Sequence, residues 1–220
     1  SDGSLTATQN LTITVTDVNE TPANSAPSGL STSGSLVMQE NEAVGTIVGT
    51  FTAHDPDGDS LYYYLASGMG DGNNSMFTMD TNGTLRTAMS FDYESYQSLN
   101  ISVVVLDDSN ASEVGSFSVA VTNENEAPNA LDHVSGLTVL ENQVSGTIVE
   151  TFTAQDPDGD SLSYHLVSGT GDGNNSMFAM ETNGTLRTAM EFDYESYQTL
   201  SIRVKAMDGN SSSVEGAFTV

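Results

Sequence analysis

The segment HDPDGDSL, residues 54–61, returns as QDPDGDSL at residues 155–162. Asp55, Asp57 and Asp59 stand at alternate positions of the first copy. Alternate residues of an extended loop can turn toward one ion, and Gly58 permits the tight curvature that this needs. Oxygen-rich loops of this kind suit calcium, which takes six to eight oxygen ligands in flexible geometry. The loop is not an EF-hand, because its glycine is in the fourth place and no Glu stands in the twelfth.

Further acidic clusters accompany the loop in each copy, always in the same order. One acid precedes the loop, an Asp-x-Glu pair follows it, and another Asp ends a strand-like run. With the loop acids, these acidic clusters comprise Glu40, Asp55, Asp57, Asp59, Asp92, Glu94 and Asp107 in the first copy, and Glu141, Asp156, Asp158, Asp160, Asp193, Glu195 and Asp208 in the second. Asn125 and Glu126 stand between the copies, and Asn19 and Glu20 are their counterparts before the first copy.

The acidic clusters belong to a tandem repeat. FDYESYQ starts at Phe91 and again at Phe192, and at that offset residues 36–119 align with 137–220 without a gap. Roughly 55 of the 84 aligned pairs are identical. A repeat of this length, about 100 residues, is long enough to be a domain with its own core.

Each repeat reads as short strands separated by turns. Leu61, Tyr63 and Leu65 occupy alternate positions and would face the core. The same alternation runs through residues 101–105, at Ile101, Val103 and Val105, and through residues 117–121, at Phe117, Val119 and Val121. Ile47, Phe51 and Ala53 suggest another inward-facing set, although Glu150 replaces Gly49 on that side in the second repeat. No stretch of ten residues keeps a helical period, so about seven short strands per repeat predict an all-β fold, an antiparallel β-sandwich.

The bulk composition excludes several classes of function. The 220 residues carry 30 acidic and 4 basic side chains, a net charge of −26, so nucleic acid is not expected as a partner. There are no cysteines, which excludes disulfides, thiolate metal sites and cysteine nucleophiles. Asp92 and Glu94 resemble a glycosidase acid pair only superficially, since small sandwiches rarely place such a pair across a cleft. We therefore expect no enzyme activity.

The ordered motifs resemble the cadherin repeat: Glu-Asn, then Ala-x-Asp-x-Asp, then Asp-Tyr-Glu, then a strand-end Asp, then Asn-Glu-Ala-Pro. The resemblance implies tandem seven-stranded Greek-key sandwiches with calcium bound between successive domains. It divides the chain into residues 1–22, the last strand and linker of a preceding repeat; 23–29, a linker; 30–128, domain 1; and 129–220, domain 2, cut within its last strand. Leu11, Ile13 and Val15 would belong to that preceding strand.

The resemblance also implies a complete calcium junction between the two domains. Glu40, Asp92, Glu94, Asn125 and Glu126 would come from the upstream side, and Asp156, Asp158 and Asp208 from the downstream side. The other junctions are partial: Asn19 and Glu20 would face Asp55, Asp57 and Asp107, whereas Glu141, Asp193 and Glu195 await a further repeat. Asn123 stands where the family has Asp, and the linker is one residue short, which leaves the number of ions open.

The expected function is that of extracellular adhesin repeats stiffened by calcium, in which the other repeats of the same chain are partners. The linkers resemble those of large bacterial surface proteins. Homophilic protein contacts and surface polysaccharide stay open as further partners. A carbohydrate-binding module of a secreted polysaccharide-active protein, or a pure spacer, is the alternative. Tyr62 and Tyr64 would suit a sugar platform, but the second repeat has Ser163 and His165 there, which favours an ordinary strand face.

Overall fold

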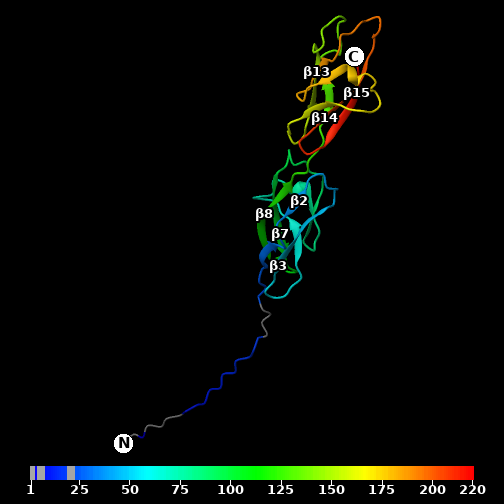
Figure 1. Ribbon diagram of the computed structural model, residues 1–220. Helices are drawn as coiled ribbons and strands as arrows, with labels where there is room; N and C mark the ends of the chain where they lie inside the picture. Colours follow the sequence, from blue (N-terminus) through cyan, green and yellow to red (C-terminus); the bar gives the residue numbers. More distant parts are fainter. Residues whose placement is uncertain (1–2, 4–7, 19–22) are drawn as a thin grey trace.

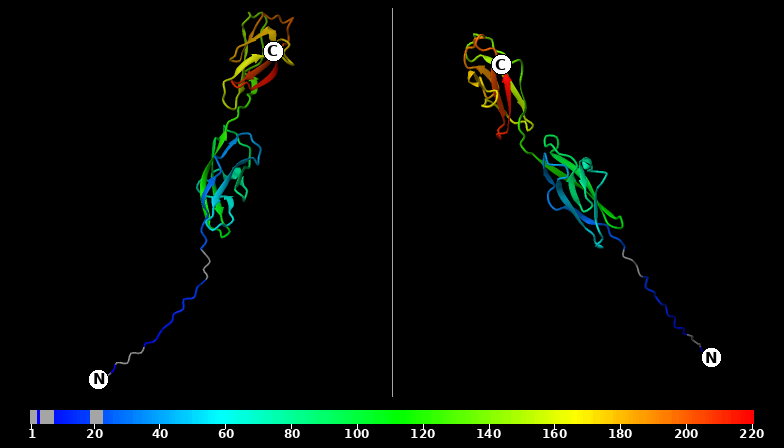
Figure 2. Two further views of the ribbon diagram at one scale, coloured as in Figure 1. Left: turned by 60° about the horizontal axis from the view of Figure 1, so that its bottom comes forward. Right: turned by 90° about the vertical axis from the view of Figure 1, so that its right-hand side faces the viewer.

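The computed structural model describes Gly3, residues 8–18 and residues 23–220. Two β-sandwiches follow one another end to end, and residues 8–18 approach the first as an extended segment (Figure 1). The two turned views show the same end-to-end order, with one connecting segment between the sandwiches (Figure 2). The described residues form strands joined by turns and irregular segments; their two helices are single 3-10 turns, neither of which could span a bilayer.

Domain 1 contains eight strand segments in two sheets. They are β1 (Ser28–Thr32), β2 (Val37–Gln39), β3 (Ile47–His54), β4 (Tyr62–Leu65), β5 (Phe77–Met79), β6 (Thr84–Thr87), β7 (Ser98–Leu106) and β8 (Ser112–Thr122), with the 3-10 turn η1 (Asn74–Met76) before β5. One sheet has the order β1-β3-β6-β5 and the other β2-β8-β7-β4. β1 and β2 act as two halves of one first strand that changes sheets, which gives the expected seven strands.

Domain 2 repeats this plan in the next part of the chain. Its strands are β9 (Asn129–His133), β10 (Ile148–Gln155), β11 (Ser163–Leu166), β12 (Phe178–Met180), β13 (Thr185–Thr188), β14 (Ser201–Met207) and β15 (Ser213–Thr219), with η2 (Asn175–Met177) before β12. The sheets have the orders β12-β13-β10-β9 and β11-β14-β15. Within the described residues, the strand pairs are antiparallel except β2 with β8, which pair in parallel. The predicted all-β tandem sandwich is confirmed.

The inward faces of the two sheets form the core of each domain. Phe51, Leu85 and Ile101 are fully buried in domain 1, and Phe152, Leu186 and Ile202 repeat them in domain 2. Burying a side chain of this size contributes about 1.5–3 kcal/mol relative to leaving it exposed. Tyr63 and Tyr164 point inward as expected, whereas Tyr62 and Tyr64 lie on the exposed face of β4.

One expectation from the sequence differs from the structure, and the expectation of a strand at Leu11, Ile13 and Val15 stays a prediction. Ile47 is 56% exposed and does not face the core, because the register of β3 against β6 shifts between Ile47 and Gly49. Val48 points inward in its place and is buried. Residues 8–18 form no strand: no described strand lies beside them, and Val15 is 89% exposed. An unpaired strand leaves its backbone groups to water, so the sequence alternation alone does not create a sheet.

The two domains differ at one buried position on the second long strand. Gly49 in β3 lies against Leu36, whose Cδ2 would be 2.5 Å from a Cβ placed there. Glu150 takes this position in β10, and its buried carboxylate accepts hydrogen bonds from the backbone N–H and the hydroxyl of Ser135. These hydrogen bonds lower the pKa of Glu150, with a smaller contribution from the nearby His133. The second domain therefore replaces an apolar contact with a satisfied buried carboxylate.

Candidate metal centre

Three acids of domain 1 gather at the end that faces domain 2. Glu40 follows β2, and Asp92 and Glu94 lie in the FDYE segment between β6 and β7. Carboxylate oxygens of these three residues all lie within 4.8 Å of one another. We call Glu40, Asp92 and Glu94 the inner group. Such spacing suits several oxygens that share one cation, and like charges this close repel strongly in its absence.

A second set of acids joins domain 1, the linker and domain 2. Glu94, Glu126 and Asp158 also present carboxylate oxygens within 4.8 Å of one another. We call these three the bridging group. Glu94 belongs to both groups, so the carboxylates form a continuous series from domain 1 through the linker into domain 2. This arrangement brings together residues from three separate segments, as the sequence motifs predict.

Glu40 is the most deeply placed acid of the series. It is only 1% exposed, and its two carboxylate oxygens accept the backbone N–H groups of Tyr93 at 2.7 Å and Glu124 at 2.7 Å. The backbone N–H of Glu40 in turn donates to Thr122 O, which continues the β2–β8 pairing. One buried carboxylate thus ties the FDYE segment to the start of the linker, which fixes the geometry of the inner group.

The bridging group shows the electrostatic strain expected of crowded acids. Desolvation raises the pKa of Glu126, and repulsion from Glu40, Asp158 and Asp92 raises it further, against a hydrogen bond from Asn41 that lowers it. Desolvation is also the largest cause that raises the pKa of Glu94, with repulsion from Glu40 and Glu126. A bound divalent cation would relieve this repulsion, because it favours the ionised carboxylates.

Asp158 is oriented by the linker itself. Its Oδ2 accepts the backbone N–H of Glu126 at 2.8 Å, and its Oδ1 accepts the side-chain amide of Asn123 at 2.8 Å. Asn123 is the residue that departs from the family's Asp, and here it donates to the neighbouring carboxylate. Gly159, with φ of +76°, lets the loop turn back after Asp158.

A third set of polar residues surrounds Asn125. Its side-chain amide donates to Asp208 Oδ2 at 2.9 Å, and this hydrogen bond is the largest cause that lowers the pKa of Asp208. Asn210 donates to Asp160 Oδ2 at 3.2 Å and to Asn125 Oδ1. Sequence reasoning did not identify Asn210, Asn41 or a role for Asp160. Only their positions beside the acidic motifs could have indicated them.

Unpartnered buried oxygens provide a test of whether these residues fit a metal ion. Among the described residues, three buried side-chain oxygens have no hydrogen-bond partner: Asp55 Oδ2, Glu126 Oε2 and Asp156 Oδ2. A buried carboxylate oxygen without a partner is costly, because its lost hydration is not replaced. All three belong to predicted calcium ligands, and hard oxygen donors are what calcium takes. The residues present therefore fit the ion that the sequence predicts.

The N-terminal end of domain 1 has a related but smaller arrangement. Asn24 donates to Asp107 Oδ2 at 2.7 Å, and the backbone N–H of Ser25 donates to Asp57 Oδ2 at 2.6 Å. Asn19 and Glu20, which the sequence placed opposite these acids, lie outside the described residues. Sequence reasoning missed Asn24, although the match of residues 24–27, Asn-Ser-Ala-Pro, with residues 125–128, Asn-Glu-Ala-Pro, could have found it.

The far end of domain 2 repeats the inner group. Glu141, Asp193 and Glu195 present carboxylate oxygens within 4.8 Å of one another, and all three are exposed. The backbone N–H of Tyr194 donates to Glu141 at 3.2 Å, as that of Tyr93 does to Glu40. The motif alone therefore places the three acids together, without burying them.

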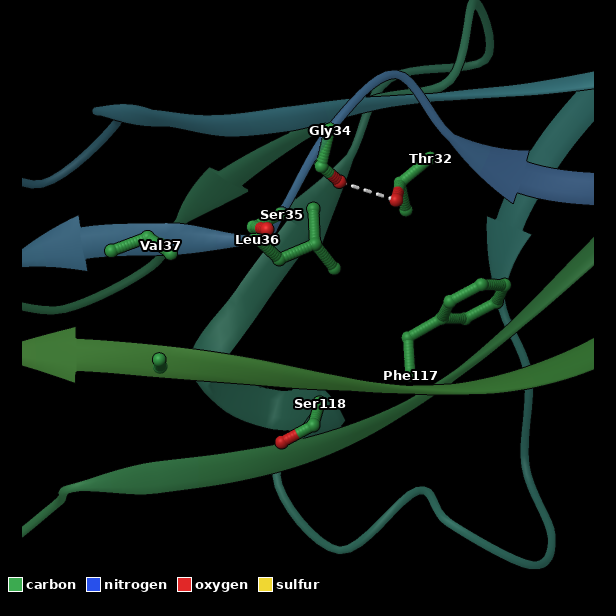
Figure 3. Close-up of a pocket in the computed structure, with 8 residues that line it drawn as sticks. Thr32, Gly34, Ser35, Leu36, Val37, Phe117 and Ser118 are labelled. Carbon is green, nitrogen blue, oxygen red and sulfur yellow. Dashed lines mark hydrogen bonds between the residues drawn. The ribbon is translucent and has the colours of Figure 1, made fainter.

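A groove on the described part of domain 1 lies away from these acids. It has a volume of about 800 Å³ and runs between the β1–β2 connection and β8, where Leu36, Val37 and Phe117 line it (Figure 3). Its lining contains only apolar side chains, backbone and hydroxyl groups. Groups that could ligate a hard cation or transfer protons gather instead at the domain boundary, which makes that boundary the candidate functional site.

Comparison with known proteins places this geometry in a family. The model of the cadherin domain matches residues 34–122 and 136–220. Human cadherin-7 is 33% identical over 163 residues, which cover 71% of this chain and 20% of cadherin-7. Mouse protocadherin Fat 4 is 32% identical over 215 residues, which cover 94% of this chain and 4% of that protein. The chain thus spans a fifth or less of these relatives.

Solved structures agree on the fold. Domains EC1-2 of human protocadherin-24 match with a TM-score of 0.68 and 18% identity, over 90% of this chain and 97% of that one. Protocadherin gamma B2 extracellular cadherin domains 3–6 match with a TM-score of 0.64 and 20% identity, over 87% of this chain and 46% of that one. These relatives are animal cadherins and protocadherins, so the comparisons do not support a specifically bacterial source. The chain belongs to the cadherin family, and its two tandem cadherin domains are non-enzymatic modules like the extracellular domains of larger cadherins.

Proposed function

We propose that this chain is a pair of extracellular cadherin domains, part of a larger cell-surface protein, whose junction is stiffened by calcium. One observation carries the proposal: carboxylates of domain 1, the linker and domain 2 meet within 4.8 Å in the bridging group of Glu94, Glu126 and Asp158. The unpartnered buried oxygens of Glu126 and Asp156 support it, because they lie on the two sides of the same junction.

Charge explains why the junction needs a cation. Two carboxylates about 4 Å apart repel by about 4 kcal/mol at an effective dielectric of about 20. Several such pairs would exceed the margin of 5–15 kcal/mol by which a typical domain is stable. The seven carboxylates assigned to the junction would carry −7, which three calcium ions, at +6, nearly balance. When bound, calcium supplies positive charge that holds the carboxylates together.

Domain 1, domain 2 and the linker each contribute different ligand oxygens to the junction. The inner group presents preset oxygens from domain 1, because Glu40 is buried and bonded to backbone on both oxygens. Asp158 presents oxygens from domain 2, oriented by Asn123 and Glu126. Glu126 is shared between the two sides. Loss of the ions would leave the same acids to repel one another, so the joint would open and flex.

A stiff joint of this kind would serve cell adhesion. A series of sandwiches with fixed joints is a rod that can present a distal binding surface, and the partner could be a second copy of the protein. A glycan-binding role is favoured by one observation only, the exposure of Tyr62 and Tyr64 side by side on β4. A glycan array separates that role from adhesion, and self-association measured with and without calcium tests homophilic contact.

Calcium titration by calorimetry tests the proposed function. The chain as it stands should bind calcium, and Asp158→Asn, which keeps the shape of the side chain, should remove at least one ion and lower the affinity. Thr78→Ala, on the exposed face of β5, is the matched control and should titrate like the parent. Equal stoichiometry and affinity in the parent and Asp158→Asn would contradict the proposal.

A further inference from the structure

Sequons for N-linked glycans recur along the described part of the chain. A sequon is an Asn followed two places later by Ser or Thr, with no Pro between them, and it can carry a sugar only where the folded surface leaves room. The sequons of the described residues begin at Asn10, Asn73, Asn82, Asn100, Asn110, Asn174, Asn183 and Asn210. Both domains share two of them: Asn73 corresponds to Asn174, and Asn82 corresponds to Asn183. The structure separates these two pairs.

The side-chain amides of Asn73 and Asn174 are already used by the fold. Asn73 Oδ1 accepts the backbone N–H of Asn100 at 2.9 Å, and Asn73 Nδ2 donates to Met76 Sδ at 3.7 Å. Asn174 makes the same pair of contacts in domain 2, at 2.9 Å and 3.6 Å. Asn210 is engaged as well, through the hydrogen bonds that its amide donates at the junction. A sugar on any of these nitrogens would displace a contact of the folded state.

The side-chain amides of Asn82 and Asn183 face outward. Asn82 Oδ1 accepts the backbone N–H of Thr84 at 3.1 Å, and Asn183 Oδ1 accepts that of Thr185 at 3.0 Å. Both asparagines are exposed, so holding the oxygen end of each amide leaves the nitrogen end to solvent. Within the described part of the chain, neither Nδ2 atom and neither threonine hydroxyl makes a hydrogen bond. The fold therefore uses the backbone of these sequons and leaves their reactive groups free.

The turn that presents Asn82 is held by both sheets. The backbone N–H of Tyr63, in β4, donates to Thr81 O at 3.2 Å, and that of Phe51, in β3, donates to Gly83 O at 2.8 Å. Gly83 is buried with φ of +87°, and a Cβ there would lie 2.6 Å from Phe51 O, so a side chain would not fit. Domain 2 repeats both hydrogen bonds, at 3.2 Å and 2.9 Å. The asparagine thus has a fixed place on the surface of each domain.

Turn chemistry explains only part of this motif. Asn and Gly are common in tight turns, and the turn uses only the backbone of Thr84. The hydroxyl is nevertheless kept in the second repeat as Thr185, whereas the exposed Thr78 of the neighbouring strand β5 becomes Ala179. A sequon needs that hydroxyl, and the turn does not.

We propose that Asn82 and Asn183 carry N-linked glycans, one on each domain. The co-reactant is a lipid-linked oligosaccharide diphosphate, used by a transferase of the secretory pathway. The asparagine Nδ2 forms a bond to the anomeric carbon of the first sugar, and the bond from that carbon to the diphosphate oxygen breaks. The lipid diphosphate leaves, and a base of the transferase takes one amide proton. The inference rests on the extracellular location in the proposed function, because only secreted chains meet this transferase.

The position of the turn gives the glycans a use. In domain 1, β5 is the last strand of one sheet and β4 the last strand of the other, and the turn bonds to β4 across the open side between them. Edge strands with free backbone groups pair readily with other chains. A sugar at Asn82 would shield both edges, and one at Asn183 would shield β11 and β12 in the same way.

Secretion of the full chain from animal cells, followed by mass spectrometry of its peptides, tests the inference. Peptides that contain Asn82 and Asn183 should carry glycan, and those that contain Asn73 and Asn174 should not. Glycan on the second pair with none on the first would overturn the inference, because the free amides would then not be the acceptors.

Matched threonine variants show whether the sequon is what directs the sugar. Thr84→Ala and Thr185→Ala should each remove the mass of one glycan, whereas Thr84→Ser should keep it. Thr78→Ala, an exposed change that domain 2 already carries, is the control and should leave both glycans in place. The double variant Thr84→Ala/Thr185→Ala should aggregate faster on heating than Thr78→Ala. Equal rates would show that the sugars do not shield the edges.

Calcium titration of the same secreted protein separates this inference from the proposed function. Bare Asn82 and Asn183 in a secreted chain that binds calcium would overturn the inference alone. Glycan on both residues in a chain that binds no calcium would support the inference and defeat the proposed calcium junction.

Discussion

The same three acids stand at the far end of both domains, yet only one set is enclosed. In domain 1, Glu40 is buried and bonded to the backbone of Tyr93 and Glu124. In domain 2 its counterpart Glu141 is exposed and keeps only the bond from Tyr194. The difference is supplied by the linker and by the next domain, which follow domain 1 and bring Glu124, Glu126 and Asp158. The motif therefore provides half of a site, and the neighbouring module completes it.

Removing the first acid of each set should give the largest difference. Glu40→Ala leaves the buried N–H groups of Tyr93 and Glu124 without acceptors, which costs about 1–3 kcal/mol each, or roughly 2–6 kcal/mol of unfolding free energy. Glu141→Ala, at an exposed position, should cost less than about 1 kcal/mol. Urea denaturation in calcium measures both. Equal losses in the two variants would show that enclosure by the linker is not what distinguishes the two sets.

Calcium should stabilise domain 1 more than domain 2. Most of the proposed junction ligands lie in domain 1, and a ligand at one hundred times its dissociation constant stabilises the folded state by about 2.7 kcal/mol. Hydrogen exchange with and without chelator measures each domain separately. We expect the larger loss of protection in β7 and β8, with a smaller one in β14 and β15. A uniform loss across both domains would contradict the assignment.

The buried position 150 gives a smaller difference between the domains, and one that depends on pH. The pKa of Glu150 in the folded domain lies below its ordinary value of 4.5, chiefly because of the hydrogen bond from Ser135. Its stabilisation is therefore fully present above that ordinary value, and is lost as the pH falls through the lower folded value. Glu150→Gln should remove this dependence from domain 2, at a cost of about 1–2 kcal/mol at neutral pH.

The measurement is the free energy of unfolding of chelator-treated protein, determined at a series of pH values from 7 to 3. The difference between the parent and Glu150→Gln should shrink below about pH 4.5 as the parent's carboxylate is protonated. The same substitution has no counterpart in domain 1, where Gly49 stands, and the acid response of domain 1 should be the same in both proteins. A difference that stays constant across this range would show that the charge of Glu150 is not what stabilises β10.

The smallest expected effect concerns a matched pair of asparagines. Asn41 and Asn142 both have left-handed backbone, with φ of 60° and 58°, so replacement by Gly keeps the conformation in each. Asn41 also donates to Glu126 across the linker. Asn41→Gly should therefore cost about 0.5–1.5 kcal/mol, and Asn142→Gly close to zero. A thermal melt in calcium compares them, and a larger cost at Asn142 would argue against the contact with Glu126.

The sequence predicts the fold and most of the acidic site because both follow from repeated patterns. Residues such as Tyr63 and Ile101 lie at alternate positions of strands, and Glu40, Glu94 and Asp158 belong to ordered motifs. Ile47 does not follow the pattern, because the register shift between Ile47 and Gly49 in β3 turns its side chain away from the core. Asn24 does not follow the pattern, because the first linker is five residues longer than the second. Residues 11–18 match 117–124 at an offset of 106, whereas residues 24–27 match 125–128 at an offset of 101. Periodicity cannot detect a bulge or an insertion whose effect appears only when strands pair.

Asn123 and Asn210 were not predictable as contacts for a different reason. Their partners, Asp158 for Asn123 and Asp160 for Asn210, lie 35 and 50 residues away along the chain. Only the packing of the linker against domain 2 decides which of many surface amides reaches a carboxylate. Sequence spacing specifies the ligand types at the junction, whereas the folded linker specifies how they are oriented.

The distance between the two domains tests the central claim most directly. The chain has no cysteine, so Thr78→Cys and Ala179→Cys, at equivalent exposed positions of β5 and β12, allow one spin label on each domain. Double electron–electron resonance should give a narrow distribution of label-to-label distances in calcium and a broad one in chelator. Asp158→Asn should broaden the distribution measured in calcium. Distributions of equal width with and without calcium would contradict the account that shared carboxylates hold the two domains together.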